Sequence, residues 1–516
     1  MLTLSISKNK KYLFTSSEKR YQNDKSRLLY QNFFYKMLSL TNQLTNIRLL
    51  VIKMNSKNIF LLCAVCISTL LVFSGCSQDQ SHQETQRPNI LLILTDDMGY
   101  ADAGFQGSTE ILTPNLDALA ENAVVFTDAH VTATVCSPSR AGIVTGRYQQ
   151  KFGHEANVPP RNKGMDSSQV TIADVLLEAG YRTSVNGKWH LGFLDEYHPN
   201  SRGFEHFYGF LGGHRTYFAS DYPPGHPRAL MYNMEHAPFP GDYLTTAQGD
   251  SAVAFIGRAH EDPFFLFLSF LAPHAPMDAT EEDLALFEGH DRPEYAAMMY
   301  AMDREVGKVV ETLKTEGKFD DTLIFFLSDN GGSPVNDSNN YPLKGFKGNK
   351  FEGGHRVPYF IHWPNGIEGG KTFDGLTSSL DIFPTSMAAA GIPVPADLPL
   401  DGVNLLPFMD GTQTGHPHDK LFFRKLEGAA MRDGHWKLIR LDDFGYVMYD
   451  LENDPGETNN LVDAHPERFE SMKADLEAWE ETLVETWWEE SEAWQEVTRE
   501  IHKSLMQNET PERVSP

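Results

Sequence analysis

Three segments of the chain are almost entirely apolar, and polar side chains follow each of them directly. The segments are residues 89–94 (NILLIL), 264–271 (FFLFLSFL) and 322–327 (TLIFFL). An uninterrupted apolar run of this length is typical of a strand that is buried on both faces of a sheet. Amphipathic stretches that predict helices, such as 170–179 and 295–316, lie between these runs. Strands that alternate with helices predict an α/β fold with a mostly parallel central sheet flanked by helices.

The polar residues at the ends of these three runs predict one shared site. Asp96 and Asp97 follow the first run, His274 follows the second, and Asp329 and Asn330 follow the third. Because ligands bind beyond the carboxyl ends of strands in open α/β sheets, we expect these side chains to lie together. Carboxylate and amide oxygens suit a hard cation, and Ca²⁺ accepts this mixed set better than Mg²⁺ does. Taken alone, either pair could instead be a solvated turn or a helix cap.

The sequence pattern changes after a Pro- and Gly-rich stretch at residues 395–407. Short strand-like segments and then a helix-like segment follow it, and together they predict a small antiparallel sheet with a helix. We therefore expect a larger domain at residues 87–405 and a smaller C-terminal α+β subdomain at residues 418–483. Residues 484–516 are acidic and contain several Trp residues, and we expect either a helical extension or a loose tail there.

Residues 54–76 have the layout of an export signal. A basic start, an apolar run and small residues before Cys76 are typical of a secretory signal peptide, and the ending Phe-Ser-Gly-Cys resembles a bacterial lipoprotein box. The resemblance implies cleavage before Cys76, lipidation of its thiol, and a polar tether at residues 77–86. We expect an exported protein that is lipid-anchored on the outer membrane, on its periplasmic or cell-surface side. A membrane-spanning anchor is the alternative, although the apolar run is short for a bilayer. Residues 1–53 are then best explained as an upstream extension from a start codon assigned too early.

The net charge of −26 restricts the partners of the protein. Its 70 Asp and Glu residues outnumber its 44 Lys and Arg residues, so nucleic acid and anionic lipid would be repelled from the surface. We expect no nucleic-acid partner, and contact with a membrane only through the lipid anchor. An anionic substrate would require a pocket in which positive charge is concentrated.

One thiol, Cys136, remains in the chain after the expected processing at Cys76. A lone thiol in an exported protein cannot form an internal disulfide, so this residue needs another role. Ser137 and Pro138 can begin a helix, and a helix N-terminus favours negative charge on the residue beside it. Arg140, about one turn further on, could donate hydrogen bonds to oxygens at position 136. The alternative is an ordinary buried cysteine.

Residues 136–146 (CSPSRAGIVTG) resemble the signature of the formylglycine-dependent sulfatases, which is Cys-x-Pro-Ser-Arg followed at a fixed spacing by Thr-Gly. The resemblance is arylsulfatase-like, extends over about residues 87–483 and implies the fold of the alkaline-phosphatase superfamily. Further matching motifs are PNILLILTDDMGYAD at 88–102, GKWHLG at 187–192, APHAP at 272–276, LSDNGG at 327–332, LKGFKGNKFEGGHRVP at 343–358 and YDLENDPGETNNL at 449–461.

The resemblance also implies cofactors and a set of site residues. A sulfatase-maturating enzyme would oxidise Cys136 to formylglycine (3-oxoalanine), and the hydrated aldehyde would be the nucleophile. The implied ligands of a Ca²⁺ ion are Asp96, Asp97, the modified Cys136, Asp329 and Asn330. The implied catalytic residues around them are Cys136, Arg140, Lys188, His190, His274 and Lys347.

Sulfate ester cleavage requires charge stabilisation on the sulfate oxygens and a proton for the leaving alcohol. Lys188 and Lys347 match the family lysines that bind the sulfate oxygens. His274 fits a general acid or a hydrogen-bond donor to a sulfate oxygen near the leaving group. His190 fits the base that removes the proton of a second hydroxyl at position 136 and so restores the aldehyde. Taken singly, these residues could instead be surface lysines and structural histidines.

We expect the substrate to be a sulfated carbohydrate, such as an oligosaccharide from an algal or host glycan. The loop at residues 208–218 suits a sugar subsite, with His214 as a contact and Arg215 paired to a uronate or a second sulfate; a packed connector is the alternative. Two rival functions remain open. One is a phosphodiester or phosphonate hydrolase of the same fold, because both kinds of ester are tetrahedral oxyanions. The other is a tethered glycan-binding protein that lacks the modified cysteine.

Overall fold

The computed structural model describes residues 87–159, 163–258, 262–426 and 428–515. The predicted signal segment, the lipidation site at Cys76 and the tether at residues 77–86 lie outside the described residues. Within the described ranges, no helix combines the length and the apolar character that crossing a lipid bilayer requires.

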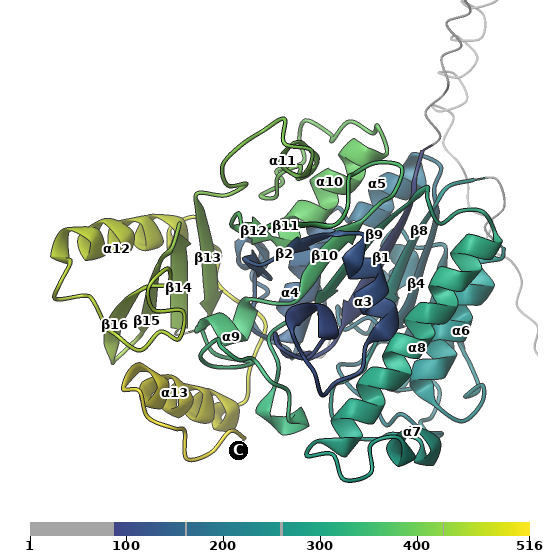
Figure 1. Ribbon diagram of the computed structural model, residues 1–516, viewed down its shortest axis with the longest axis horizontal. Coiled ribbons are helices and arrows are strands. Elements are labelled where there is room, and N and C mark those ends of the chain that lie inside the picture. Colours follow the sequence, from purple (N-terminus) through teal and green to yellow (C-terminus); the bar gives the residue numbers. More distant parts are fainter. Residues whose placement is uncertain (1–86, 160–162, 259–261, 427, 516) are drawn as a thin grey trace, which may run out of the picture. The chain divides into compact units, whose positions relative to one another are not determined.

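A ten-stranded, mostly parallel sheet forms the centre of the fold (Figure 1). Its spatial order is β11-β2-β10-β9-β1-β8-β4-β5-β6-β7. The parallel centre consists of β9 (Thr322–Ser328), β1 (Asn89–Thr95), β8 (Phe264–Ser269), β4 (Arg182–Lys188) and β5 (His206–Phe210). The outer strands are β10 (Tyr359–His362), β2 (Val124–Phe126), β11 (Lys371–Phe373), β6 (Met231–Tyr232) and β7 (Glu235–His236). The three apolar runs are adjacent central strands, which confirms the predicted α/β fold.

Helices cover both faces of this sheet, because alternate residues of each strand point to opposite sides. Leu91 and Ile93 of β1 belong to the apolar core on one face, and Leu92 and Leu94 belong to the core on the other. The helices that contribute to the first core are α3 (Pro114–Glu121), α6 (Leu244–Ile256) and α8 (Pro293–Thr315). Those that contribute to the second are α4 (Cys136–Thr145), α5 (Ile172–Glu178) and α10 (Ile382–Ala389). The predicted helices at 170–179 and 295–316 are therefore α5 and α8, with slightly different bounds.

A four-stranded antiparallel sheet forms the C-terminal subdomain. Its strands, in spatial order, are β13 (Lys420–Lys425), β14 (Gly428–Asp433), β15 (Trp436–Leu441) and β16 (Gly445–Asp450). Met472 and Leu476 of α12 (Pro466–Glu480) pack in the apolar core on one face. Val497 and Ile501 of α13 (Glu492–Met506) pack in the core on the other. The predicted small antiparallel sheet with a helix is confirmed, and Figure 1 shows the two helices on either side of it.

A buried ionic network joins the central sheet to the C-terminal sheet. At its centre is Glu352, the first residue of the short helix α9 (Glu352–His355). One of its carboxylate oxygens accepts a hydrogen bond from Lys437 at 2.8 Å, and the other accepts one from Arg432 at 2.7 Å. Arg432 also pairs at 3.0 Å with Asp128, which lies just beyond β2. Burial alone would raise the pKa of Glu352, but Arg432 and Lys437 hold it well below its usual range.

We expect Glu352→Ala to lower the free energy of unfolding by about 3–5 kcal/mol, because Arg432 and Lys437 would remain buried without their shared partner. Urea unfolding followed by tryptophan fluorescence measures this loss. The matched control is Glu477→Ala, which removes one side of an exposed ion pair with Lys473 and should lose far less stability. Equal losses in the two variants would contradict the role given to Glu352.

Candidate active site

Four adjacent strands of the central sheet end in polar residues at the same edge. These strands lie side by side in the order β9-β1-β8-β4 and run parallel, so their carboxyl ends meet. The predicted site residues that these strand ends and the loops after them carry are Asp96, Asp97, Lys188, His190, His274, Asp329 and Asn330. The fold thus brings residues from distant parts of the sequence to one place.

Cys136 lies against this edge as the first residue of α4, with 1% of its surface exposed. Its Sγ donates a hydrogen bond to Oδ1 of Asp96 at 3.5 Å. Ser137 fixes the first turn of the helix, since its backbone N–H donates to Oδ1 of Asn157 at 3.0 Å and its hydroxyl donates to the carbonyl of His190 at 2.6 Å. Position 136 is therefore held at a helix N-terminus that faces the strand ends.

Two lysines place positive charge around the thiol. Nζ of Lys188 hydrogen-bonds to Oδ2 of Asp96, and Nζ of Lys347 lies 2.6 Å from Oδ1 of Asp97. Burial alone would raise the pKa of Cys136, but Lys188 and Lys347 lower it to about 7. The same two ammonium groups would stabilise an oxyanion bound next to position 136.

Arg140 is buried one turn along α4 and connects the nucleophile helix to the strand ends. Its Nε donates to Oδ2 of Asp329 at 2.9 Å, and its Nη1 donates to the carbonyl of Lys188 at 3.1 Å. Its Nη2 has no hydrogen-bond partner among the described residues and lies 3.5 Å from Oδ2 of Asp96. The guanidinium thus orients two carboxylates and keeps one donor available beside Cys136.

The carboxylates and one amide form a cluster of oxygen donors that fits Ca²⁺. The backbone N–H of Asp97 donates to Oδ1 of Asp329 at 3.3 Å, and Nδ2 of Asn330 donates to Oδ1 of Asp97 at 2.7 Å. Oδ1 of Asn330 is buried without a hydrogen-bond partner in the described part of the chain, and a cation would satisfy it. The side chains with ligand atoms all within 4.8 Å of one another are Asp96, Asp97, Cys136 and His274.

His274 is placed to donate a proton. Its Nε2 lies 3.6 Å from Oδ2 of Asp97, and its Nδ1 lies 2.6 Å from the carbonyl oxygen of Ala275. Burial alone would lower the pKa of His274, but the charges of Asp97 and Asp96 raise it. A carbonyl acceptor at Nδ1 fixes the ring and leaves Nε2 as the proton donor toward the site.

His190 is placed to accept a proton. Its Nε2 lies 3.2 Å from the carbonyl oxygen of Asn157, and its Nδ1 has no hydrogen-bond partner among the described residues. Burial and the charges of Lys188 and Arg140 lower its pKa well below the usual range. The ring packs against Gly213, where an added Cβ would lie 2.6 Å from Cε1 of His190. Two histidines whose surroundings shift their pKa values in opposite directions are suited to acid and base roles.

The family follows from comparisons with known proteins. The family model described as "Sulfatase" matches residues 88–392, which is more than half of the chain. The protein belongs to the sulfatase family. A second family model, described as "N-sulphoglucosamine sulphohydrolase, C-terminal", matches residues 347–484 of this sulfatase. The resemblance found in the sequence is confirmed, and the protein is a sulfuric ester hydrolase.

Two mammalian proteins illustrate how far the similarity extends. Human N-acetylgalactosamine-6-sulfatase is 34% identical over 345 residues, which cover 62% of this sulfatase and 66% of the human protein. Arylsulfatase A of Bos taurus is 33% identical over 443 residues, which cover 75% of this sulfatase and 86% of the bovine protein.

Solved structures share the fold. The crystal structure of Ps i-CgsB in complex with k-i-k-neocarrahexaose has a TM-score of 0.75 and 38% identity, and the match covers 80% of this sulfatase and 97% of that chain. The phosphonate monoester hydrolase of Agrobacterium radiobacter has a TM-score of 0.59 and 23% identity, with 76% of this sulfatase and 96% of that chain covered. The second likeness shows a common fold alone.

The two predicted substrate contacts in the loop at residues 208–218 of this sulfatase differ in their exposure to solvent. His214 is exposed, and its ring stacks near that of His274 with the centroids 6.3 Å apart. Arg215 is buried, and its guanidinium donates to the carbonyls of Thr216 and Arg228 at 3.1 and 3.0 Å. Arg215 therefore holds the loop together, and it lines a hollow with His214 and His274, so contact of either residue with a substrate stays a prediction.

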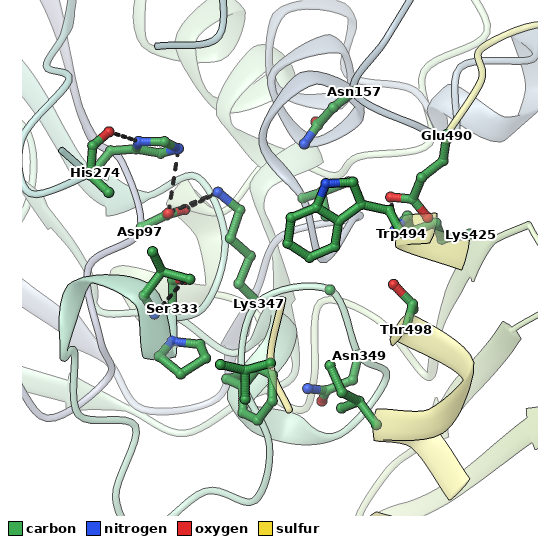
Figure 2. A pocket seen from close by; sticks show the side chains of 18 of the residues that line it. Asp97, Asn157, His274, Ser333, Lys347, Asn349, Lys425, Glu490, Trp494 and Thr498 are labelled. Carbon is green, nitrogen blue, oxygen red and sulfur yellow. Dashed lines mark hydrogen bonds and ion pairs between the residues drawn. The ribbon is translucent and has the colours of Figure 1, made fainter. Parts of the chain in front are cut away.

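A cavity of about 340 Å³ opens onto three of the predicted site residues of this sulfatase (Figure 2). Asp97, His274 and Lys347 line it on one side, and Glu490 and Trp494 line it on the other. Sequence reasoning assigned no site role to the residues after position 483. α13 is the helical one of the two alternatives expected for residues 484–516, but no sequence signal relates that helix to the residues at the strand ends.

Proposed function

We propose that this sulfatase hydrolyses a sulfate ester on a carbohydrate, with formylglycine at position 136 and Ca²⁺ as cofactors. The observation that carries the proposal is the position of Cys136, whose Sγ lies 3.5 Å from Oδ1 of Asp96 and close to the positive charges of Lys188 and Lys347. A nucleophile at this position would have a cation site on one side and two ammonium groups for the sulfate oxygens on the other.

A hydrated formylglycine would supply an oxygen nucleophile, and Ca²⁺ would withdraw charge from the sulfate. The residues that would hold the ion are Asp96, Asp97, the modified Cys136, Asp329 and Asn330. Lys188 and Lys347 bind and orient the sulfate oxygens, because their Nζ atoms lie beside the carboxylates at the strand ends. His274 donates a proton from the cavity wall to the leaving alcohol oxygen. His190 accepts a proton from a hydroxyl at position 136 through its unpartnered Nδ1.

Two measurements test this function. The intact mass of the tryptic peptide that contains residue 136, from protein made together with a maturating enzyme, should show formylglycine; a free, alkylatable thiol would instead favour a glycan-binding protein. With calcium present, the rate on p-nitrophenyl sulfate should exceed the rate on bis(p-nitrophenyl) phosphate. A faster reaction with the phosphodiester would contradict the sulfatase proposal and favour a phosphodiester or phosphonate hydrolase of the same fold.

We expect calcium to stabilise the protein and its removal by a chelator to lower both Tm and turnover. Binding to the folded state alone adds about 2.7 kcal/mol when the free ion is at 100 times its Kd. The rise in Tm with added calcium should be much smaller in Asp329→Asn, which lacks one carboxylate ligand. Thermal unfolding at a series of calcium concentrations measures the difference.

The matched control for this prediction is Asp303→Asn. Asp303 is a buried carboxylate as well, but it accepts hydrogen bonds from the backbone of Asn115 and Leu116, away from the site. Its replacement should lower Tm at every calcium concentration and keep the calcium-dependent rise. A full calcium response in Asp329→Asn would contradict its role as a ligand.

The carbohydrate part of the proposal is supported by the solved relative of 38% identity that was crystallised with k-i-k-neocarrahexaose. The exposed His214, next to His274, is a suitable contact for a sugar that carries the sulfate. A panel of sulfated oligosaccharides from carrageenans and glycosaminoglycans, assayed for released sulfate, tests this. Sulfate release from p-nitrophenyl sulfate but from no oligosaccharide would contradict a carbohydrate substrate.

We further propose that the protein is exported and anchored by a lipid on Cys76. The layout of residues 54–76 supports this proposal. We expect the protein to fractionate with membranes in a bacterial host and Cys76→Ser to be released in soluble form. Detergent-free release of the unchanged protein would contradict the anchor.

A further inference from the structure

One wall of the active-site cavity comes from the end of the chain. The residues of this segment that line the cavity include Glu489, Glu490, Trp494 and Thr498. All of them lie beyond residue 484, where the match to the second family model ends. This wall therefore belongs to a part of the chain that neither family model describes.

The segment is held firmly against the nucleophile side of the fold. The buried ring of Trp488 stacks on that of His154 with the centroids 3.5 Å apart, and the backbone N–H of Glu489 donates to the carbonyl of Val158 at 2.9 Å. His154 in turn lies 2.8 Å from the hydroxyl of Ser137, beside the nucleophile. The wall is thus fixed before any substrate binds, which favours binding because little ordering remains to be done.

Trp494 is the large apolar residue of this wall. Its side chain is 42% exposed, and its indole makes no ring-stacking or cation–π contact within the described residues. Figure 2 shows the indole between Lys347 on one side and the Glu490–Lys425 pair on the other. An aromatic face of this kind attracts the C–H face of a sugar ring, whose hydrogens carry partial positive charge.

Polar groups beside the indole are free to bind hydroxyls. Oε1 of Glu490 pairs with Nζ of Lys425 at 2.6 Å, while its Oε2 is buried and has no hydrogen-bond partner among the described residues. Nδ2 of Asn349, a residue that is 1% exposed, is a buried donor that also has no hydrogen-bond partner among the described residues. An acceptor and a donor on the cavity wall, next to an aromatic face, are typical of a site for a polyhydroxylated ring.

We infer that this wall is a second sugar subsite, in which Trp494 stacks on the ring next to the sulfated one and Glu490 accepts a hydrogen bond from a hydroxyl of that ring. The carboxylates Glu489 and Glu490 favour hydroxyl groups over sulfates at this place. The inference rests on the proposed carbohydrate sulfatase function and deepens it. It makes Trp494 a substrate-binding residue that distinguishes oligosaccharides from small sulfate esters.

The test compares two substrates in the full-length, formylglycine-containing protein. For each variant, the ratio of kcat/KM on k-i-k-neocarrahexaose to kcat/KM on p-nitrophenyl sulfate is measured. We expect Trp494→Ala to lower this ratio by at least about tenfold, mainly through KM, and Trp494→Phe to recover part of the loss. The matched control is Phe444→Ala, which removes another exposed aromatic ring, 39% exposed, that is not part of the cavity wall.

A ratio in Trp494→Ala within twofold of the wild-type ratio would overturn the subsite. The subsite would also be overturned if Phe444→Ala lowered this ratio as much as Trp494→Ala does. Failure of the proposed function is recognised in the wild-type protein itself, which would then release sulfate from neither substrate or from p-nitrophenyl sulfate alone. Binding gives a second readout: fluorescence titration of the Cys136→Ala protein with the hexaose should show a Kd at least about tenfold lower than that of the same protein with Trp494→Ala added.

Discussion

Cys136→Ala is expected to lower kcat on p-nitrophenyl sulfate by at least about 10⁴-fold, because the variant has no side chain that the maturating enzyme can convert into a nucleophile. The fold should survive. The side chain of Cys136 hydrogen-bonds to Asp96 and His274 only through Sγ, and the helix that it begins is held by Ser137, Arg140 and its own apolar residues. Steady-state kinetics and thermal unfolding of the same preparation measure both effects.

A second preparation separates the modification from the residue. Wild-type protein made without a maturating enzyme retains Cys136, and it should be as inactive as the alanine variant although its sequence is unchanged. Turnover within tenfold of the mature enzyme in either preparation would show that another residue attacks the sulfate. Both proteins should keep most of the calcium-dependent rise in Tm, since Asp96, Asp97, Asp329 and Asn330 are intact and only the ligand at position 136 is missing.

His190→Ala is expected to slow steady-state turnover by roughly 10²- to 10⁴-fold, the usual contribution of a positioned general base. The first sulfate transfer does not need this base in the proposed scheme. The variant should therefore release p-nitrophenol in a burst of about one equivalent per site and then stop. Rapid-mixing absorbance measures the burst, and the mass of the peptide that contains residue 136 should increase by that of a sulfate group.

The control for this experiment is His435→Ala, because the side chain of His435 is 48% exposed and lies in the C-terminal sheet. It should show wild-type turnover and no burst. Steady turnover near the wild-type rate in His190→Ala would exclude its role as the base. A loss of activity without a burst would instead place His190 in the first transfer.

Three of the central strands, β1, β8 and β9, could be predicted because they are almost entirely apolar, which indicates burial on both faces. The same feature predicted the site, since Asp96 and Asp329 follow β1 and β9 directly, His274 lies in the loop after β8, and parallel neighbours end at one edge. Cys136 and Lys188 could be assigned only through the family motifs. They are 52 residues apart in the sequence, and this spacing by itself does not predict that their side chains lie close together.

Two features were beyond the reach of the sequence. Arg215 donates hydrogen bonds to the carbonyls of Thr216 and Arg228 and to the hydroxyl of Ser220, and such contacts depend on the path of the chain rather than on residue type. Trp494 lies in a stretch for which the sequence predicts either a helical extension or a loose tail, and no role in the site. Its place at the cavity follows from long-range contacts of its neighbours, such as the stacking of Trp488 on His154.

The charge cluster around Glu352 has a consequence for how the protein denatures. Lys437 and Arg432 belong to the C-terminal sheet, while Asp128 and Glu352 belong to the chain around the central one. If either sheet unfolded alone, buried charged side chains of the other sheet would lose ion-pair partners. A calorimeter should therefore record a single heat-absorption peak for the two layers, and chains caught with one layer intact and the other lost should be rare at any temperature.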